Sequence, residues 1–316
     1  MNRLEHLKKH TILVADTGEI DQIKQYRPTD ATTNPSLILK ASTIKEYHPL
    51  IDEAVTYGRS KGGDRQLKCI LTKLFVNFGS EILRWIPGRV STEIDARFSF
   101  DVTKSIEQAE EYIRLYAKAG IDRKRVLIKL ASTWEGIVAG AELEKRGIHC
   151  NMTLMFDLAQ AIASAEAHVT LISPFVGRIL DWHQKEDKKR LFLPHEDPGV
   201  LFVNEIFNYY KKFGYQTQIM GASFRNVEEI LELCGCDFLT IAPPFLKKLS
   251  ESEGPVSQKL SIENATKSSI QKLSMNEATF RWMLNENAMA TEKLSEGIRN
   301  FATDMRTLER LIKSKL

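Results

Sequence analysis

The sequence has few cysteines, and none of them stands at a spacing that metal or disulfide sites commonly use. The four cysteines are Cys69, Cys150, Cys234 and Cys236, and no two of them form a CxxC pair. Free cysteines are among the most buried residue types, so we expect reduced thiols in a core rather than cross-links. Thiols stay reduced inside cells, and the composition therefore favours a cytoplasmic protein.

Long apolar runs are also missing. The N-terminal stretch MNRLEHLKKHTILVADTGE lacks the apolar segment of a signal peptide, since ILVA is cut short by Asp16. No other segment approaches the roughly 20 apolar residues that a membrane-spanning helix needs. We therefore expect no association with a membrane.

Neither sign of charge is in large excess. Lys and Arg together number 44, and Asp and Glu number 41, which leaves a difference of 44 − 41 = 3. Dedicated nucleic-acid binders usually carry a clear basic surplus, so we expect no nucleic-acid partner. The balance still leaves room for a local basic pocket that binds a small anion.

No low-complexity linker divides the 316 residues, and short apolar runs alternate with helical patterns along the whole chain. Eight runs read as strands: 11–16, 30–33, 89–95, 125–130, 149–155, 169–173, 217–223 and 237–243. Helical patterns occupy 43–60, 103–120, 197–214, 225–235 and, as a long charged amphipathic helix, 287–316. Residues 250–275 are rich in Ser and Lys and read as an exposed excursion.

Strands that alternate with helices pair in parallel, and eight such units predict a closed (β/α)8 TIM barrel. We expect a single domain over residues 1–316, with extra helices at the termini and a C-terminal helical extension. The alternative is an open doubly wound sheet, which usually has a Gly-rich turn after its first strand. Here the first strand is followed by DTGEI, which is not GxGxxG.

A lysine stands inside one of the most apolar runs, RVLIKL at 125–130. Side chains alternate between the two faces of a strand, which places Lys129 with Leu127 and opposite Val126, Ile128 and Leu130. In a barrel the aliphatic face meets the helices, so Lys129 points inward near the carboxyl end of its strand, where barrel enzymes place their chemistry. Burial of an unpaired ammonium is unfavourable, and the position calls for an explanation.

Other strand ends carry polar residues in the same way. They are Asp16, Glu93, Asn151, Thr153, Ser173, Ser223 and Arg225. Each has a structural alternative: Asp16 as a turn or cap residue, Glu93 as a buried acid paired with Arg97, and Lys129 as a side chain that reaches solvent. Together they favour Schiff-base catalysis, in which a desolvated lysine attacks a carbonyl and carboxylates move the protons.

Seven motifs in order resemble transaldolase, of the long, Schiff-base type. They are VADTG (14–18), DATTNPSL (30–37), PGRVSTEIDAR (87–97), LIKLASTWEG (127–136), CNMTLMF (150–156), ISPFVGRILDW (172–182) and MGASFRN (220–226). The resemblance runs from about residue 8 to the C-terminus and is weakest over 250–280. It implies a (β/α)8 barrel enzyme of the pentose phosphate pathway that moves a dihydroxyacetone unit between sugar phosphates.

The resemblance also implies a role for each site residue. Lys129 forms the Schiff base, Asp16 takes the proton from the C4 hydroxyl, and Glu93 handles protons through a water held with Thr153. The three-carbon unit is bound by Asn34, Asn151 and Ser173. Arg178, Ser223 and Arg225 bind the phosphate, and Phe175 forms a wall of the pocket. No cofactor or metal is implied, and the family suggests a homodimer.

Three other functions remain open on the sequence. A Schiff-base aldolase would release free dihydroxyacetone, and a non-catalytic sensor would bind sugar phosphates without turnover. A metal-dependent aldolase has little support, because the candidate ligands His149, His168, His183 and His195 show no ligand spacing.

Overall fold

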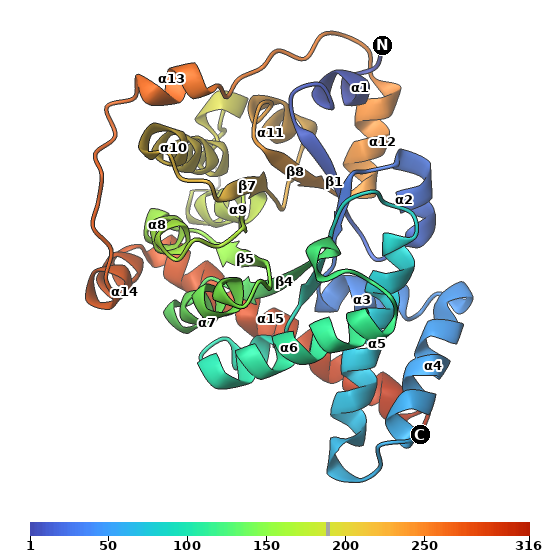
Figure 1. The fold of residues 1–316 in the computed structure, drawn as a ribbon. Helices are drawn as coiled ribbons and strands as arrows, with labels where there is room; N and C mark the ends of the chain where they lie inside the picture. The colour runs from blue at the N-terminus through green and yellow to red at the C-terminus, as the bar shows by residue number, and fades with distance from the viewer. Residues whose placement is uncertain (188–189) are drawn as a thin grey trace.

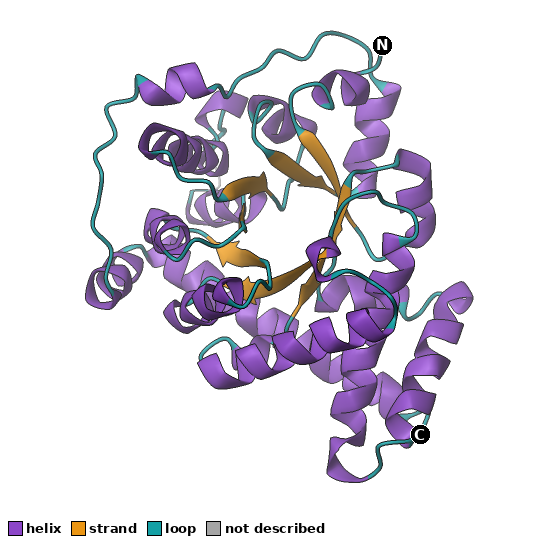
Figure 2. Ribbon diagram, in the orientation of Figure 1, coloured by secondary structure: helices purple, strands orange, loops and turns teal. Residues whose placement is uncertain are grey.

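The computed structural model describes residues 1–187 and 190–316 and contains a closed barrel of eight parallel strands in chain order (Figures 1 and 2). The strands are β1 Ile12–Asp16, β2 Asp30–Thr32, β3 Val90–Glu93, β4 Val126–Ala131, β5 Cys150–Met155, β6 Leu171–Pro174, β7 Gln218–Gly221 and β8 Phe238–Ile241. The barrel closes because β1 pairs with both β2 and β8. Each predicted apolar run overlaps one of these strands, so the barrel prediction is confirmed and the open sheet is wrong.

Helices surround the barrel. The predicted helical patterns correspond to α4 His48–Arg59, α6 Val102–Lys118, α10 Pro198–Phe213, α11 Val227–Glu232 and α15 Ala288–Lys313. The other α-helices are α1 Arg3–Leu7, α2 Ile20–Tyr26, α3 Pro35–Ala41, α5 Gln66–Leu83, α7 Trp134–Lys145, α8 Leu158–Glu166, α9 Gly177–Glu186, α12 Pro243–Glu251, α13 Ile262–Thr266 and α14 Glu277–Glu286. Short 3₁₀ turns are η1 Lys45–Tyr47, η2 Gly63–Arg65, η3 Ala96–Phe98, η4 Arg123–Arg125 and η5 Pro194–Glu196.

Local sequence signals explain where the helices begin and end. The side chain of Asp197 accepts hydrogen bonds from the first backbone N–H groups of α10, and Pro198 occupies the first helical position. The same helix ends at Gly214, whose φ of 72° lies in the left-handed region that favours glycine.

The strand faces separate as the alternation predicts. Val126, Ile128 and Leu130 are buried in the layer between strands and helices. A small apolar layer fills the inside of the barrel and consists of Val14, Leu127, Leu171, Met220 and Phe238. Leu127 and Lys129 share a face, so Lys129 lies above this layer, toward the carboxyl ends of the strands.

Residues 250–275 pass over the outside of the molecule between α12 and α14, the orange segment of Figure 1. Most of these side chains are exposed, as expected, but Val256, Leu260 and Ala265 are buried and attach the segment to the core. Lys212 of α10 also donates hydrogen bonds to the Ser268 and Ile270 carbonyls. In the described part of the chain, no helix combines the length and apolar character required to cross a membrane.

The last helix, α15, lies across the carboxyl end of the barrel (Figure 1). It packs on α3, η3, β5 and α9, each of which contains or follows the carboxyl end of a strand. The side-chain contacts that attach it include Ser36 with Asp304, Arg97 with Glu309 at 2.6 Å, and Trp182 with Glu292 at 2.8 Å. The C-terminal helix therefore covers part of the barrel mouth.

Candidate active site

Strand register brings Lys129 and Glu93 together. The two residues are direct partners across β3 and β4, and Asn151 is the partner of Lys129 across β4 and β5. Lys129 is 4% exposed and Glu93 is 2% exposed, with 3.1 Å between Nζ and Oε2. Nζ also donates to the Thr33 carbonyl at 3.3 Å. The alternative in which Lys129 reaches solvent is therefore wrong.

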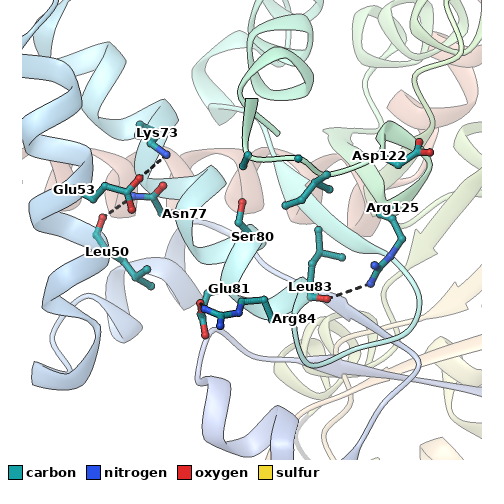
Figure 3. Close-up of a pocket in the computed structure, with 13 residues that line it drawn as sticks. Leu50, Glu53, Lys73, Asn77, Ser80, Glu81, Leu83, Arg84, Asp122 and Arg125 are labelled. Carbon is teal, nitrogen blue, oxygen red and sulfur yellow. Dashed lines mark hydrogen bonds and ion pairs between the residues drawn. The ribbon is translucent and has the colours of Figure 1, made fainter. Parts of the chain in front are cut away.

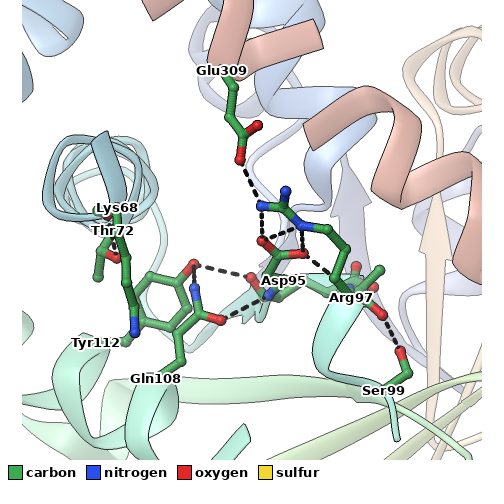
Figure 4. Close-up of polar contacts among 10 residues, drawn as sticks. Lys68, Thr72, Asp95, Arg97, Ser99, Gln108, Tyr112 and Glu309 are labelled. Carbon is green, nitrogen blue, oxygen red and sulfur yellow. Dashed lines mark hydrogen bonds and ion pairs between the residues drawn. The ribbon is translucent and has the colours of Figure 1, made fainter. Parts of the chain in front are cut away.

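The alternative that pairs Glu93 with Arg97 is also wrong. Arg97 binds Asp95, with Nε 2.9 Å from Oδ1, and it binds Glu309 of α15 (Figure 4). On the other side, the Asp95 backbone N–H donates to Gln108 at 2.9 Å. These contacts hold the chain just beyond β3, and they leave the Glu93 carboxyl free to face Lys129.

Asp16 lies at the end of β1, half-buried, and accepts a hydrogen bond from Thr32 at 3.0 Å. Burial raises the pKa of Asp16 and also that of Glu93, and the positive charge of Lys129 opposes the shift in both. Two carboxyls whose pKa values are raised by burial thus share the electrostatic field of one buried amine, an arrangement typical of catalytic sites.

Two oxygens beside the lysine lack a hydrogen-bond donor among the described residues. They are Oε2 of Glu93 and Oγ1 of Thr153, and both are buried. The 3.1 Å approach of Lys129 to Glu93 is an ion pair whose direction does not meet hydrogen-bond geometry. Buried polar atoms are nearly always satisfied, so this pair marks a place prepared for another molecule.

A chain of hydrogen bonds crosses the barrel next to the lysine. Ser173 donates to the Asn151 carbonyl oxygen at 2.6 Å, and the Asn151 amide donates to Ser91 at 3.0 Å. We did not predict Ser91 as a site residue, although its position two residues before Glu93 on β3 places it on the same face. Asn34 is the residue at which α3 begins, and its side-chain Oδ1 accepts from the Leu37 N–H at 2.9 Å, which leaves its amide NH₂ available to a ligand.

Two arginines follow the neighbouring strands β6 and β7. The Arg178 guanidinium lies 5.0 Å from the ring centre of Phe175 and 5.7 Å from that of Phe301. Burial and the positive charge of Arg225 both lower the pKa of Arg178. Two guanidinium groups close enough to repel one another would be stabilised by an anion between them.

Arg225 and Ser223 belong to one turn. Arg225 forms a two-pronged ion pair with Asp181 of α9, with Nη2 2.6 Å from Oδ2 and Nε 3.0 Å from Oδ1. Its Nη1 also lies 3.5 Å from the Ser223 hydroxyl. An anion bound by Arg225 would therefore share this guanidinium with Asp181.

The described residues also line hollows on the surface of the protein. One of about 540 Å³ opens beside Asp16, between α2, α3 and α12, and includes Lys40 and Lys247. Another, of about 580 Å³, lies between α4, α5 and the turn before β4 and contains none of the predicted site residues (Figure 3). In that hollow the Lys73 ammonium and the Glu53 carboxylate pair with each other at 2.8 Å, so neither charge needs a ligand. The polar cluster inside the barrel is the better candidate.

Within the described residues, no group of three or more His, Cys, Asp and Glu side chains is arranged to hold a metal ion. The chemistry that the site can perform with its own residues is that of a buried amine with two acids that can transfer protons.

The profile of the family described as transaldolase/fructose-6-phosphate aldolase matches residues 13–312. The transaldolase of Protochlamydia amoebophila is 58% identical over 314 residues, which cover 99% of this chain and 98% of that protein. The transaldolases of Rattus norvegicus and Homo sapiens are each 55% identical over 316 residues, which cover 99% of this chain and 94% of those proteins.

Proposed function

The chain belongs to the transaldolase/fructose-6-phosphate aldolase family, and from this premise we propose that its buried cluster performs the transaldolase reaction through a Schiff base on Lys129. The protein is an enzyme, a transferase of the transaldolase type. The observation that carries the residue assignment is the buried Lys129 amine, which lies 3.1 Å from the Glu93 carboxyl and interacts electrostatically with Asp16.

The reaction moves a dihydroxyacetone unit between sugar phosphates. The donor is sedoheptulose 7-phosphate or fructose 6-phosphate, and the acceptor is glyceraldehyde 3-phosphate or erythrose 4-phosphate. These interconversions belong to the non-oxidative pentose phosphate pathway, which follows from the family. No cofactor enters the proposed chemistry.

Lys129 supplies the electron acceptor. Its neutral amine adds to the ketose carbonyl and loses water to form a protonated imine. When the bond between C3 and C4 breaks, the electron pair left on C3 is drawn into this imine, so charge is stabilised where it develops. Arginine could not replace Lys129, because a guanidinium remains protonated and cannot condense.

Glu93 handles the protons of imine formation in this proposal. The addition step and the loss of water each transfer a proton near the lysine nitrogen, and Glu93 lies 3.1 Å from that atom. Its Oε2 and the Thr153 hydroxyl, for which the described part of the chain supplies no hydrogen-bond partner, can hold a bridging water. Burial raises the pKa of Glu93, which favours a carboxyl that can donate as well as accept a proton.

Asp16 takes the C4 hydroxyl proton as the carbon–carbon bond breaks and returns one when the acceptor aldehyde adds. It enters from β1, whereas Glu93 enters from β3, so the two acids approach a bound sugar from different strands. The hydrogen bond from Thr32 orients the Asp16 carboxyl for this step.

The remaining side chains bind the sugar. Asn34, Asn151 and Ser173 bind hydroxyls of the three-carbon unit. Arg178, Ser223 and Arg225 bind the phosphate, and Phe175, packed against Phe156 with ring centres 5.5 Å apart, forms one wall. The repulsion between the two arginines supports this phosphate site.

The rest of the proposal concerns the whole protein. We propose that residues 1–316 act as one barrel domain with α15 as its helical extension, which the packing of α15 on α3, β5 and α9 supports. A homodimer in the cytoplasm is proposed from the resemblance to the family.

The test is whether turnover requires an acceptor. With fructose 6-phosphate as donor, we expect product only when erythrose 4-phosphate is present. Release of free dihydroxyacetone at the same rate without an acceptor would instead assign an aldolase. Binding of fructose 6-phosphate without any turnover would assign a sensor.

A further inference from the structure

Two buried carboxyls meet behind the turn that carries Ser223 and Arg225. This turn, residues 223–226, is called the phosphate turn below. Asp197 at the start of α10 is 3% exposed, and Glu229 in the first turn of α11 is 1% exposed. η5, whose C-cap residue is Asp197, packs on α11, and a hydrogen bond with Glu229 opposes the raising effect of burial on the pKa of Asp197, so the two carboxyls lie side by side. Two carboxyls can form such a bond only when one of them holds a proton, because two carboxylates only accept.

The other hydrogen bonds of the pair indicate which Glu229 oxygen is left for the contact with Asp197. Asp197 Oδ1 accepts from the backbone N–H groups of Gly199 at 2.8 Å and Val200 at 3.2 Å. Glu229 Oε2 accepts from the backbone N–H of Arg225 at 2.6 Å. Glu229 Oε1 is buried and receives no hydrogen bond from a donor among the described residues. Oε1 is therefore the Glu229 atom that can carry the shared proton.

The phosphate turn depends on the support it receives. Ser223 has a φ of 63°, a left-handed conformation that is unfavourable for residues other than glycine. Its carbonyl accepts from Gly177 at 2.6 Å, and a Cβ on Gly177 would lie 2.4 Å from that oxygen. The α9 backbone thus fixes Ser223, and Glu229 fixes the backbone of Arg225.

We propose that Glu229 is a positioning residue that holds the phosphate turn through a proton shared with Asp197, so that loss of this proton weakens sugar-phosphate binding. The inference rests on the proposed function, because it takes Ser223 and Arg225 as phosphate ligands. When the second carboxyl ionises, two negative charges face each other in a buried place. Their repulsion moves Glu229, and the Arg225 backbone moves with it.

The charges around the pair agree with a proton that is lost near neutral pH. Burial raises the pKa of Glu229 to about 7, and the negative charge of Asp197 adds to this effect. Burial also raises the pKa of Asp197. The positive charge of Arg225 opposes the shift in the pKa of Glu229, and positive charge on His183 of α9 opposes the shift in the pKa of Asp197. Burial and the charge of Arg190 in turn lower the pKa of His183.

Other charged groups on the elements around the pair, namely α9, η5, α11 and α12, contribute little to its electrostatics. Asp181 of α9 is bound to Arg225. The remaining charged side chains on η5, α11 and α12 are half-buried or exposed, namely His195, Glu196, Glu228, Glu232, Lys247, Lys248 and Glu251.

The experiment compares wild type with Glu229→Gln. A glutamine keeps both contacts, because its carbonyl oxygen accepts from Arg225 and its NH₂ donates to Asp197 without any proton to lose. KM for fructose 6-phosphate and kcat are measured between pH 6 and 9, with erythrose 4-phosphate saturating. The ratio of the two KM values cancels the titration of the substrate phosphate, which both enzymes share.

We expect this KM ratio, wild type over Glu229→Gln, to be near one at pH 6. It should rise roughly tenfold by pH 9, the effect of one weakened charge-assisted hydrogen bond, with little change in the kcat ratio. Asp197→Asn serves as a second variant, since its amide can donate to an ionised Glu229 and should also remove the pH dependence. A binding-independent readout is stability: wild type should lose stability relative to Glu229→Gln as pH rises through about 7.

The Arg225→Ala variant distinguishes failure of the proposed phosphate site from failure of the proposed role of Glu229. If Arg225→Ala leaves KM unchanged, the phosphate assignment itself is wrong. If Arg225→Ala raises KM but the KM ratio of wild type to Glu229→Gln stays constant with pH, only the role of Glu229 is overturned. A pH effect confined to kcat would likewise overturn it.

Discussion

The two ends of the barrel interior contain the same kinds of residues but use them differently. At the amino end, Arg89 binds Asp30 with Nε 3.1 Å from Oδ2, and its Nη2 donates to Gln218 at 3.0 Å. The Arg89 backbone N–H also donates to Asp30, at 2.8 Å. The guanidinium lies 5.3 Å from the ring centre of Phe238. This cation and carboxylate are thus bound to each other and to protein partners.

At the carboxyl end, the Lys129–Glu93 pair is more deeply buried than the Arg89–Asp30 pair but is incompletely bonded. Among the described residues, Oε2 of Glu93 and Oγ1 of Thr153 have no hydrogen-bond donor, and burial raises the pKa of Asp16 and of Glu93. The apolar layer around Leu127 and Met220 separates the two ends. The comparison shows polar groups with complete hydrogen bonds at the amino end, whereas the proposed site at the carboxyl end keeps oxygens that a water or a substrate could bond.

The largest expected effects come from the acids of the carboxyl end. Asp16→Asn and Glu93→Gln should each lower kcat by about 10²–10⁴, the usual contribution of a positioned acid or base. Asp16→Asn should still condense with fructose 6-phosphate and accumulate the adduct, whereas Glu93→Gln should form the adduct slowly. Borohydride trapping at several times after mixing measures this. The opposite pattern, with no adduct in Asp16→Asn and normal formation in Glu93→Gln, would reverse the two assignments.

Breaking the pair at the amino end should reduce stability and leave catalysis intact. Arg89→Met removes one partner of a buried pair, and we expect a loss of about 3–5 kcal/mol in the free energy of unfolding. Denaturant titration measures this loss, and kcat per folded molecule should match wild type. The double variant Asp30→Asn/Arg89→Met is the control, because it leaves no unpaired carboxylate and should recover part of the stability. If Arg89→Met greatly lowered kcat without loss of stability, the conclusion that the amino-end pair is structural and not catalytic would be wrong.

The arginines at the rim of the carboxyl end should act on binding. Arg178→Ala and Arg225→Ala should each raise KM for fructose 6-phosphate by an amount equivalent to roughly 1.5–3 kcal/mol, the value of a hydrogen bond to a charged group. Lys73→Ala is the matched control, since Lys73 lines the other hollow and already pairs with Glu53. If KM were unchanged in both arginine variants, the proposal that Arg178 and Arg225 bind the substrate phosphate would be wrong.

The smallest effect is a pH dependence of stability. Burial raises the pKa of Glu93 in the folded protein, so the native state binds its proton more tightly than the unfolded chain does. The stability of wild type relative to Glu93→Gln should therefore be greatest near or below about pH 4, around the ordinary pKa of the carboxyl. It should fall as pH rises through the raised pKa. Thermal unfolding of both proteins from pH 4 to 7 measures this, and a difference that grows with pH would contradict it.

Much of the fold could be predicted from the sequence because the signals are local. The two-residue alternation in RVLIKL assigns Lys129 to the inner face, and eight apolar runs predict eight strands. The same alternation could have identified Ser91. The partner of Lys129 could not be predicted in this way, because its contact with Glu93 depends on the register between β3 and β4.

Contacts between elements that lie far apart in the sequence could not be predicted from local sequence patterns. Arg97 lies close to Glu93 in sequence, yet it binds Asp95 and Glu309, because α15 returns to the barrel mouth from the far end of the chain (Figure 4). The carboxyl pair of Asp197 and Glu229 likewise exists only because η5 packs on α11. Such pairs are set by packing, and no spacing in the sequence encodes them.

The central claim is that Lys129 forms the covalent intermediate, and one measurement tests it directly. The protein is incubated with fructose 6-phosphate, reduced with borohydride, digested and mapped by mass spectrometry. We expect a single reduced adduct on the peptide that contains Lys129, and no adduct in Lys129→Met. An adduct on a different lysine, or trapping that persists in Lys129→Met, would contradict the account.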